Sequence, residues 1–136
     1  MKIEHINLVI KDLEQSLRFY RAAFPHWKIR AKGGGEWYGK ARTWVHFGDE
    51  NHYLALNEFG EGRNRDRTGH SVGLAHFAFE TQNLDAVIVR LEQAGFEIAD
   101  NGANETFRRN VYFIDPDGFE VEFVQYLSDL PNERNT

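Results

Sequence analysis

Apolar and polar residues alternate over two short stretches of the chain, and in both stretches the alternation changes to helical spacing at a Leu. The stretches are residues 5–20 (HINLVIKDLEQSLRFY) and 76–91 (HFAFETQNLDAVIVRL), and they align without a gap at an offset of 71 residues. Alternation of period 2 is typical of a strand, whereas apolar residues three and four apart indicate a helix. Each stretch is therefore predicted as a strand followed by a helix, with Asp12 and Asn83 as N-caps.

A second pair of segments repeats further along the chain. Residues 52–59 (HYLALNEF) align with residues 119–126 (FEVEFVQY) at an offset of 67 residues, and an apolar run precedes each of them. The joint DPDG at 115–118 has Asp, Pro and Gly where a type I turn favours them. Each copy is predicted to end in a hairpin, with room for one more strand before it. We therefore expect an α+β fold built from a duplicated module.

Segments rich in Gly and polar residues separate these elements. They are residues 32–41 (KGGGEWYGKA), 60–71 (GEGRNRDRTGHS) and 101–110 (NGANETFRRN), and all three are predicted as loops. The Gly-rich part, residues 33–39, lacks the Gly-Lys-Ser/Thr ending and the strand-to-helix setting of a phosphate-binding loop. We interpret it as a flexible loop and leave a role as a lid open. Residues 128–136 are expected to be a frayed tail.

Composition narrows the classes of function. The 136 residues, 41% of them apolar, are enough for one domain with a substantial core. With 21 acidic against 16 basic residues and a net charge of -5, the chain carries no block of Lys or Arg that would favour nucleic acid. No window approaches the ~18 apolar residues of a membrane span and no secretion signal is evident, so we expect no membrane partner and a cytoplasmic protein. The absence of Cys leaves nitrogen and oxygen ligands for any metal.

Two His residues and one Glu fall on the same face of the predicted strands. In each copy the more apolar face should carry the helix, which leaves His5, His76 and Glu122 on the helix-free side of the sheet. His5 and His76 also occupy equivalent positions of the repeat, which favours metal ligation by these residues together with Glu122. A lone His on a strand is more often packed or on the surface. The remaining His residues keep that interpretation: His26, His46, His52 and His70.

These motifs closely resemble the vicinal oxygen chelate superfamily, which includes glyoxalase I, bleomycin-resistance proteins, fosfomycin-resistance proteins and extradiol dioxygenases. The resemblance rests on HINLVIKDLEQSLRFY, GLAHFAFET and YFIDPDGFEVEFVQ, and it covers nearly the whole chain. It implies a single glyoxalase-like domain over residues 1–127, made of two tandem βαβββ modules at about 1–60 and 72–127. In similar proteins such modules form a curved mixed sheet around a cup.

The resemblance also implies a metal site. His5, His76 and Glu122 match the positions of the family's ligands, with one divalent ion per site, namely Zn, Ni, Mn, Fe or Co. Glyoxalase I has a fourth ligand, a carboxylate on the last strand of its first module, but the repeat alignment puts Ala55 there. Glu58 lies three residues further along and should point to the opposite face of the strand. Three ligands leave coordination sites open for a bidentate substrate or water.

Other residues near the predicted cup stay unassigned, and no catalytic residue is named. Glu120 is interpreted as a solvated neighbour of Glu122. Several Arg and aromatic residues flank the cup and would suit an anionic or polar oxygenated ligand, although each also fits an ordinary surface or core position: Arg42, Trp44, Tyr53, Arg108, Arg109 and Tyr112.

Two classes of function remain open. The first is a metal-dependent enzyme on a small-molecule substrate with oxygen donors, by resemblance a lyase or isomerase, a thiol transferase or a dioxygenase. The missing fourth ligand counts against standard glyoxalase I. The second is a small-molecule-binding protein of the bleomycin-resistance type, which carries out no chemistry. An uncovered curved sheet also favours two-fold pairing of chains, so we expect a homodimer with two equivalent metal sites.

Overall fold

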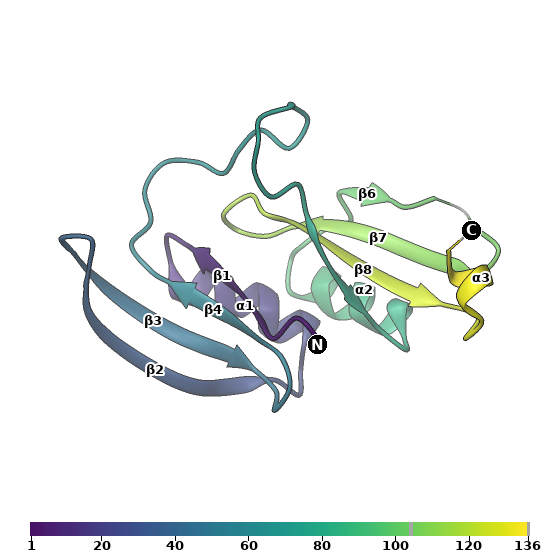
Figure 1. Cartoon of the computed structure of the whole chain (residues 1–136), viewed down its shortest axis with the longest axis horizontal. Coiled ribbons are helices and arrows are strands. Elements are labelled where there is room, and N and C mark those ends of the chain that lie inside the picture. The colour runs from purple at the N-terminus through teal and green to yellow at the C-terminus, as the bar shows by residue number, and fades with distance from the viewer. Residues whose placement is uncertain (104, 136) are drawn as a thin grey trace. The chain divides into compact units, whose positions relative to one another are not determined.

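The computed structural model describes residues 1–103 and 105–135. The chain divides into two compact units, Met1–Gly62 and Arg63–Thr136, each with its own sheet and helix (Figure 1). We call these the first unit and the second unit. The two predicted modules, at about 1–60 and 72–127, fall one in each unit.

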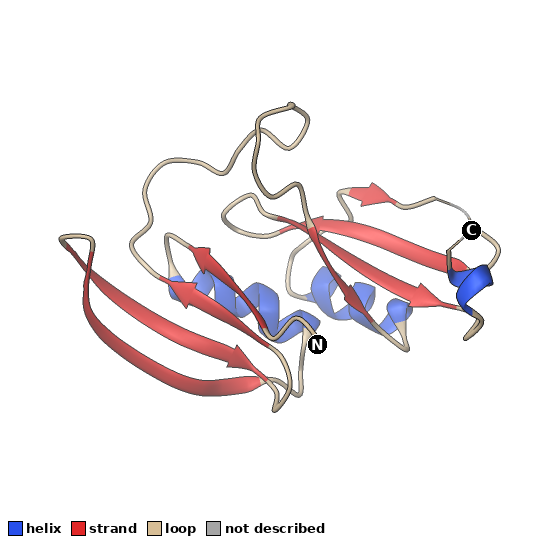
Figure 2. Cartoon of the chain, in the orientation of Figure 1, coloured by secondary structure: helices blue, strands red, loops and turns tan. Residues whose placement is uncertain are grey.

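The first unit contains four strands and one helix. In chain order they are β1 (His5–Val9), α1 (Leu13–Ala23), β2 (Lys28–Trp37), β3 (Lys40–Gly48) and β4 (Tyr53–Asn57). The strand order β1-β4-β3-β2 gives a mixed sheet, because β1 is parallel to β4 while the other neighbours are antiparallel. Figure 2 shows α1 lying across one face of this sheet.

The second unit repeats this arrangement and adds a short helix. Its elements are β5 (Phe77–Glu80), α2 (Leu84–Gln93), β6 (Asp100–Asn101), β7 (Arg108–Ile114), β8 (Glu120–Tyr126) and α3 (Pro131–Arg134). The strand order is β5-β8-β7-β6, with β5 parallel to β8 and the other neighbours antiparallel. The predicted α+β class and the tandem βαβββ modules are therefore confirmed.

Strand pairing follows the same register in both units. Asn7 on β1 pairs with Ala55 on β4, and Ala78 on β5 pairs with Glu122 on β8. The offsets of 71 and 67 residues that relate the two copies of the sequence also relate these two pairs. The repeat alignment is thus confirmed at the level of individual strand partners, and Ala55 is the structural counterpart of Glu122.

Both main helices begin at the predicted caps, and a second side chain from the last strand supports each N-terminus. Asp12 and Asn83 each accept a hydrogen bond from a backbone N–H three residues on, at 3.2 and 3.1 Å. The first N–H of α1 donates to the Glu58 carboxylate, and the first N–H of α2 donates to the Gln125 side-chain oxygen at 3.0 Å. These contacts satisfy backbone donors that the helix itself leaves unpaired. Glu58 is thereby engaged at the helix.

Each unit buries an apolar core on one face of its sheet. In the first unit the buried side chains include Leu8, Leu17, Tyr20, Phe47 and Leu56. In the second unit they include Leu84, Leu91, Phe113, Val121 and Phe123. Burial of one such side chain contributes about 1.5–3 kcal/mol. Because side chains alternate along a strand, this packing leaves the opposite face of each sheet for polar residues.

Residues 32–41, predicted as a loop, instead form the end of β2, a two-residue turn and the start of β3. Tyr38 and Gly39 both have positive φ, 49° and 82°, which a type I′ hairpin turn requires. Gly33 pairs with Trp44, and a Cβ on Gly33 would come within 2.7 Å of the Trp44 ring. The prediction of a flexible loop was wrong because this glycine serves close packing within a strand.

The other loop predictions fared better. Residues 60–71 contain no strand or helix, as predicted. In the segment 101–110, β6 ends at Asn101 and β7 begins at Arg108, so of the described residues 102, 103 and 105–107 lie between strands. Asn104 lies outside the described residues. In the segment expected to be a frayed tail, α3 forms a single turn, and Thr136 lies outside the described residues.

Candidate functional site

In the second unit, two of the three predicted metal ligands lie side by side. His76 immediately precedes β5, and Glu122 lies on β8 opposite Ala78. His76 and Ala78 are two residues apart and so point to the same face of the sheet. His76 Nε2 lies 3.1 Å from Glu122 Oε2. The structure thus brings together the His and the Glu that the sequence assigns to the second module.

Side chains of β7 hold this pair in place. The Asn110 amide donates to Glu122 Oε1 at 2.9 Å, so the two carboxylate oxygens of Glu122 have different partners. The Tyr112 ring meets the His76 ring edge-on at 5.5 Å between centroids. Burial, followed by the nearby charge of Glu122, raises the pKa of the Tyr112 hydroxyl. The Glu122 side chain is only 13% exposed, which favours a defined orientation for it.

Asn110 fits against a glycine that leaves it just enough room. It is 8% exposed, and a Cβ on Gly102 would lie 1.8 Å from Asn110 Oδ1. The same Oδ1 atom is buried and has no hydrogen-bond partner among the described residues. A buried carbonyl oxygen without a partner costs free energy, so the Asn110 side chain is held by its amide contact to Glu122 and by the shape of the site.

His5 lies in the first unit, where aromatic rings and a carboxylate surround it. Its ring stacks on Tyr53 at 4.6 Å between centroids and 13° between planes. Its Nδ1 lies 2.9 Å from Glu4 Oε1, and this hydrogen bond lowers the pKa of the Glu4 carboxyl. Tyr53 in turn stacks on His46, at 4.6 Å. The His5 side chain is 41% exposed, so it remains accessible to a ligand.

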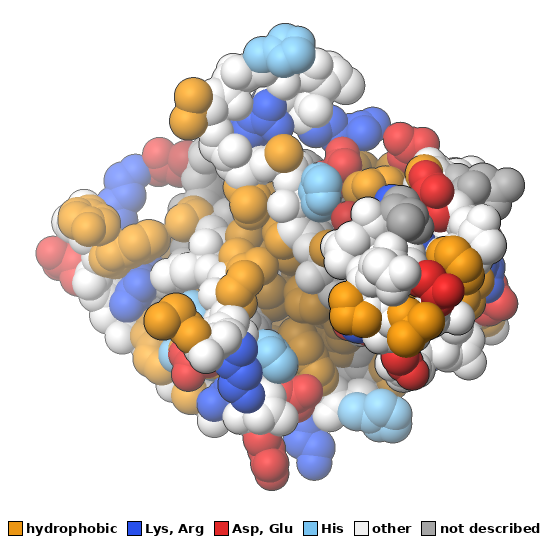
Figure 3. Space-filling view, turned by 45° about the vertical axis from the view of Figure 1, so that its right-hand side comes forward, with side chains coloured by type: hydrophobic (Ala, Val, Ile, Leu, Met, Phe, Trp, Pro, Cys, Tyr) orange, Lys and Arg blue, Asp and Glu red, His pale blue; other side chains and the backbone are white. Residues whose placement is uncertain are grey.

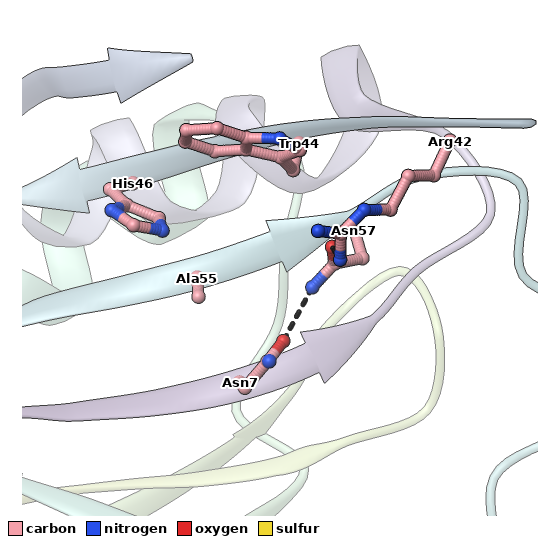
Figure 4. A pocket seen from close by; sticks show the side chains of 6 residues that line it. All are labelled: Asn7, Arg42, Trp44, His46, Ala55 and Asn57. Carbon is pink, nitrogen blue, oxygen red and sulfur yellow. Dashed lines mark hydrogen bonds between the residues drawn. The ribbon is translucent and has the colours of Figure 1, made fainter. Parts of the chain in front are cut away.

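The first unit also contains a pocket of about 280 Å³, shown in Figure 4. Six residues from β1, β3 and β4 line it: Asn7, Arg42, Trp44, His46, Ala55 and Asn57. An Arg42 N–H donates to Asn57 Oδ1 at 2.8 Å, and the Asn57 amide donates to Asn7 Oδ1. Ala55, which stands where the second unit has Glu122, is part of the lining. The sheet face that carries the acid in one unit is therefore lined by amide and guanidinium groups in the other.

The remaining sequence candidates have other surroundings. Arg109 pairs with Asp85 of α2 at 2.7 Å, and this contact lowers the pKa of the Asp85 carboxyl. Glu120, expected to be solvated, lies 3.4 Å from Arg67. Arg108 has a buried Nε with no partner among the described residues. Three His residues are exposed, in line with their interpretation as surface residues: His26, His52 and His70.

Charges of both signs share the surface, and in Figure 3 Lys and Arg side chains are interspersed with Asp and Glu. Within residues 1–103 and 105–135, no three His, Asp or Glu side chains form a group that could hold a metal ion. Of the predicted ligand set, the structure describes His76 and Glu122 as a pair in the second unit and His5 in the first unit. No helix of the described chain is long and apolar enough to cross a membrane.

Sequence reasoning missed the amide side chains of both units. Asn7 lies two residues after His5, Asn57 two residues after Ala55, and Asn110 two residues before Tyr112. Each therefore shares a strand face with a residue that was already a candidate. Period-2 spacing would have found them, had it been extended from the ionisable residues to Asn.

Comparison with known proteins agrees with this fold and repeat. The chain matches the family model of the Glyoxalase/Bleomycin resistance protein/Dioxygenase superfamily over residues 2–123. It is similar to the structure of a glyoxylase/bleomycin resistance protein/dioxygenase domain from Frankia sp. EAN1pec, with a TM-score of 0.74, 24% identity, and coverage of 93% of this chain and 98% of that chain. A glyoxalase family protein from Bacillus cereus gives a TM-score of 0.76 at 13% identity, with 94% and 95% covered.

A third similar structure comes from a resistance protein with a metal. The genomically encoded fosfomycin resistance protein FosX from Listeria monocytogenes, complexed with Mn(II) and sulfate, has a TM-score of 0.68 and 20% identity over 99% of this chain and 98% of that chain. The fold and the duplicated module define the class of protein as glyoxalase-like. The chain belongs to the Glyoxalase/Bleomycin resistance protein/Dioxygenase superfamily, as its sequence motifs implied.

Proposed function

We propose that this protein is a divalent-metal-dependent enzyme that acts on a small oxygenated substrate, with His5, His76 and Glu122 as its metal ligands. The observation that carries the proposal is the 3.1 Å approach of His76 Nε2 to Glu122 Oε2. Imidazole nitrogen and carboxylate oxygen are donor types that Mn, Fe, Co, Ni and Zn accept in proteins. A neutral His76 would present its nitrogen to a cation beside the carboxylate.

The surroundings of these donors support metal binding. Metal-binding His residues usually donate their other ring N–H to a carboxylate or carbonyl, and ligating carboxylates are themselves hydrogen-bonded. His5 has the Glu4 carboxylate 2.9 Å from Nδ1, and Glu122 accepts from Asn110 at Oε1. These contacts occupy one donor atom of each ligand, which favours His5 Nε2 and Glu122 Oε2 as the atoms that hold the metal.

The residues around the ligands would serve the reaction by orientation and hydrogen bonding. A bound divalent ion would polarise the oxygens of the substrate and stabilise negative charge on them. Asn110 would keep the Glu122 carboxylate in one orientation during turnover. The Tyr112 hydroxyl has a raised pKa and is protonated at neutral pH, so it would donate a hydrogen bond to a substrate oxygen.

The Mn(II) complex of the Listeria FosX protein supports a divalent metal as a property of the superfamily. In this chain the counterpart of Glu122 is Ala55, which removes the fourth ligand expected of glyoxalase I. A set of three ligands suits a thiol transferase or a dioxygenase better than that enzyme. We further propose a cytoplasmic homodimer with two equivalent sites, since pairing of two chains is the commonest way to bury the edges of an open sheet.

The alternative is a binding protein of the bleomycin-resistance type, in which His76 and Glu122 are only an ion pair. The pocket of the first unit favours this alternative because it offers space for a small molecule without a metal. The two functions differ in metal content, which is simple to measure.

The test is metal content after purification without added metal, followed by Mn(II) titration by calorimetry. We expect about one ion per chain, and His76→Ala or Glu122→Gln should weaken binding at least about tenfold. His70→Ala, which removes an exposed His of the same unit, is the matched control and should bind like the wild type. Absence of metal in both measurements would leave the binding-protein alternative.

A further inference from the structure

The pocket of the first unit contains none of the three proposed metal ligands, and its lining has a distinct chemistry. Among its six lining residues are one guanidinium, two amides and no carboxylate. Its volume, about 280 Å³, is close to the lower end of the roughly 300–1,000 Å³ typical of small-molecule sites. A ligand of this pocket is therefore small.

The hydrogen bonds in the pocket run in one direction. Arg42 donates to Asn57 Oδ1, and Asn57 donates from its amide nitrogen to Asn7 Oδ1 (Figure 4). Both carbonyl oxygens are thus used as acceptors, and the group at the end of the chain is the Asn7 amide nitrogen, a donor. A guanidinium has five N–H donors and no acceptor, and one donor is used for Asn57. The lining therefore presents positive charge and N–H groups, which suit an anion.

The position of Arg42 is fixed on more than one side. Its guanidinium carbon lies 5.1 Å from the centre of the Trp37 ring, which leaves the edges of the planar group for hydrogen bonding. Asn57, which accepts from it, is 97% buried because only 3% of its surface is exposed. A cation held in this way is preorganised, so little side-chain entropy is lost when a ligand binds.

Two flat rings form the apolar wall of the pocket. Trp44 and His46 lie next to each other on the same face of β3, with 4.8 Å between ring centroids. Burial lowers the pKa of His46, so its ring is uncharged at neutral pH. Gly33 has no side chain that would push the Trp44 ring out of its place, since a Cβ there would come within 2.7 Å of it. This wall suits a planar group.

We propose that this pocket binds a small planar organic acid, with its carboxylate on Arg42 and Asn7 and its flat part against Trp44. The fork of the guanidinium matches a planar carboxylate with two parallel hydrogen bonds. The inference rests on the proposed function only in that it makes such an acid the substrate class. The binding itself needs no metal, because the lining consists of side chains of the first unit.

Benzoate is the probe for the test, measured by calorimetry in EDTA and by the chemical shifts of the Trp44 indole and the Asn7 side-chain amide. Benzamide keeps the ring and lacks the charge, whereas cyclohexanecarboxylate keeps the charge and lacks the flat ring. We expect benzoate to bind about tenfold or more tightly than benzamide, and more tightly than cyclohexanecarboxylate. Absence of benzoate binding at millimolar concentration would overturn the proposal, as would equal binding of benzamide.

Variants then locate the site. Arg42→Gln should weaken benzoate binding at least about tenfold, and Arg42→Lys should restore part of it because a Lys keeps the charge without the fork. Arg21→Gln removes the same charge from an exposed position on α1 and should have no effect. Circular dichroism confirms that each variant is folded. Equal loss of affinity in Arg42→Gln and Arg21→Gln would show general charge attraction and refute the pocket.

These measurements separate the acid pocket from the metal site. If benzoate binds in EDTA and no metal binds, the acid pocket stands and the metal-dependent function fails. If Mn(II) binds and benzoate does not, the metal site stands and the acid pocket is refuted.

Discussion

Replacing Asn110 by Ala should weaken metal binding while leaving the stability of the fold almost unchanged. The substitution removes the 2.9 Å hydrogen bond to the Glu122 carboxylate, a charged contact worth about 1.5–3 kcal/mol. It also removes the buried Oδ1 atom, which has no partner among the described residues and costs about 1–3 kcal/mol. The two contributions oppose each other, so the free energy of unfolding should change by less than about 1.5 kcal/mol.

Metal affinity should respond differently, because Asn110 sets the orientation of a ligand. Loss of such a supporting contact typically weakens metal binding about 10- to 100-fold. Urea denaturation in EDTA gives the stability, and Mn(II) titration gives the affinity. Gln125→Ala is the opposite control: it removes the acceptor at the N-terminus of α2, should lower stability by about 1 kcal/mol, and should leave metal affinity unchanged. Wild-type affinity in Asn110→Ala would refute the reasoning.

Three further predictions concern the helix, the assembly and the pH response. Glu58→Ala should lower the free energy of unfolding by about 0.5–2 kcal/mol in urea, and Glu58→Gln, which keeps an acceptor at α1, by less. Light scattering should give a dimer, and a mass near 15.8 kDa would rule that out. Mixed His5→Ala and His76→Ala chains should regain half of their metal sites if partner chains share a site, and none if each site lies within a chain. Because the pKa of Asp85 is lowered in the folded protein, its pairing with Arg109 stabilises the fold above the ordinary pKa of 3.8 and is lost as pH falls through the lower folded value. Arg109→Gln should return that pKa toward 3.8 in a carboxyl NMR titration, and an unchanged value would exclude Arg109 as the cause.

The duplicated strands could be predicted from the sequence down to single pairs of residues. The alternation of apolar residues sets which face is buried, and the gapless repeat then transfers one register to the other, so that Ala55 corresponds to Glu122. The helix caps follow from Asp12 and Asn83, whose short side chains reach the first turn. These features depend on local sequence and on periodicity, which are both visible in the chain.

What could not be predicted depends on contacts between strands. The same glycine spacing fits a flexible loop or a strand packed under an indole, and only the pairing of Gly33 with Trp44 decides between them. The role of Asn110 depends on its distance to a carboxylate on the neighbouring strand. Whether Arg42 is an ordinary surface residue or part of a pocket likewise depends on Asn57, a partner 15 residues away. Such partners appear only once the strands are placed.

The methyl side chain of Ala55 has a consequence for how the two units could have diverged. At this position a carboxylate would extend among the donors of Arg42 and Asn7 and would act as a built-in occupant of the pocket. The residue that removes a metal ligand from the first unit therefore also empties a receptor for an external acid. One substitution in a duplicated strand can thus exchange one binding specificity for another while the backbone of the module is kept.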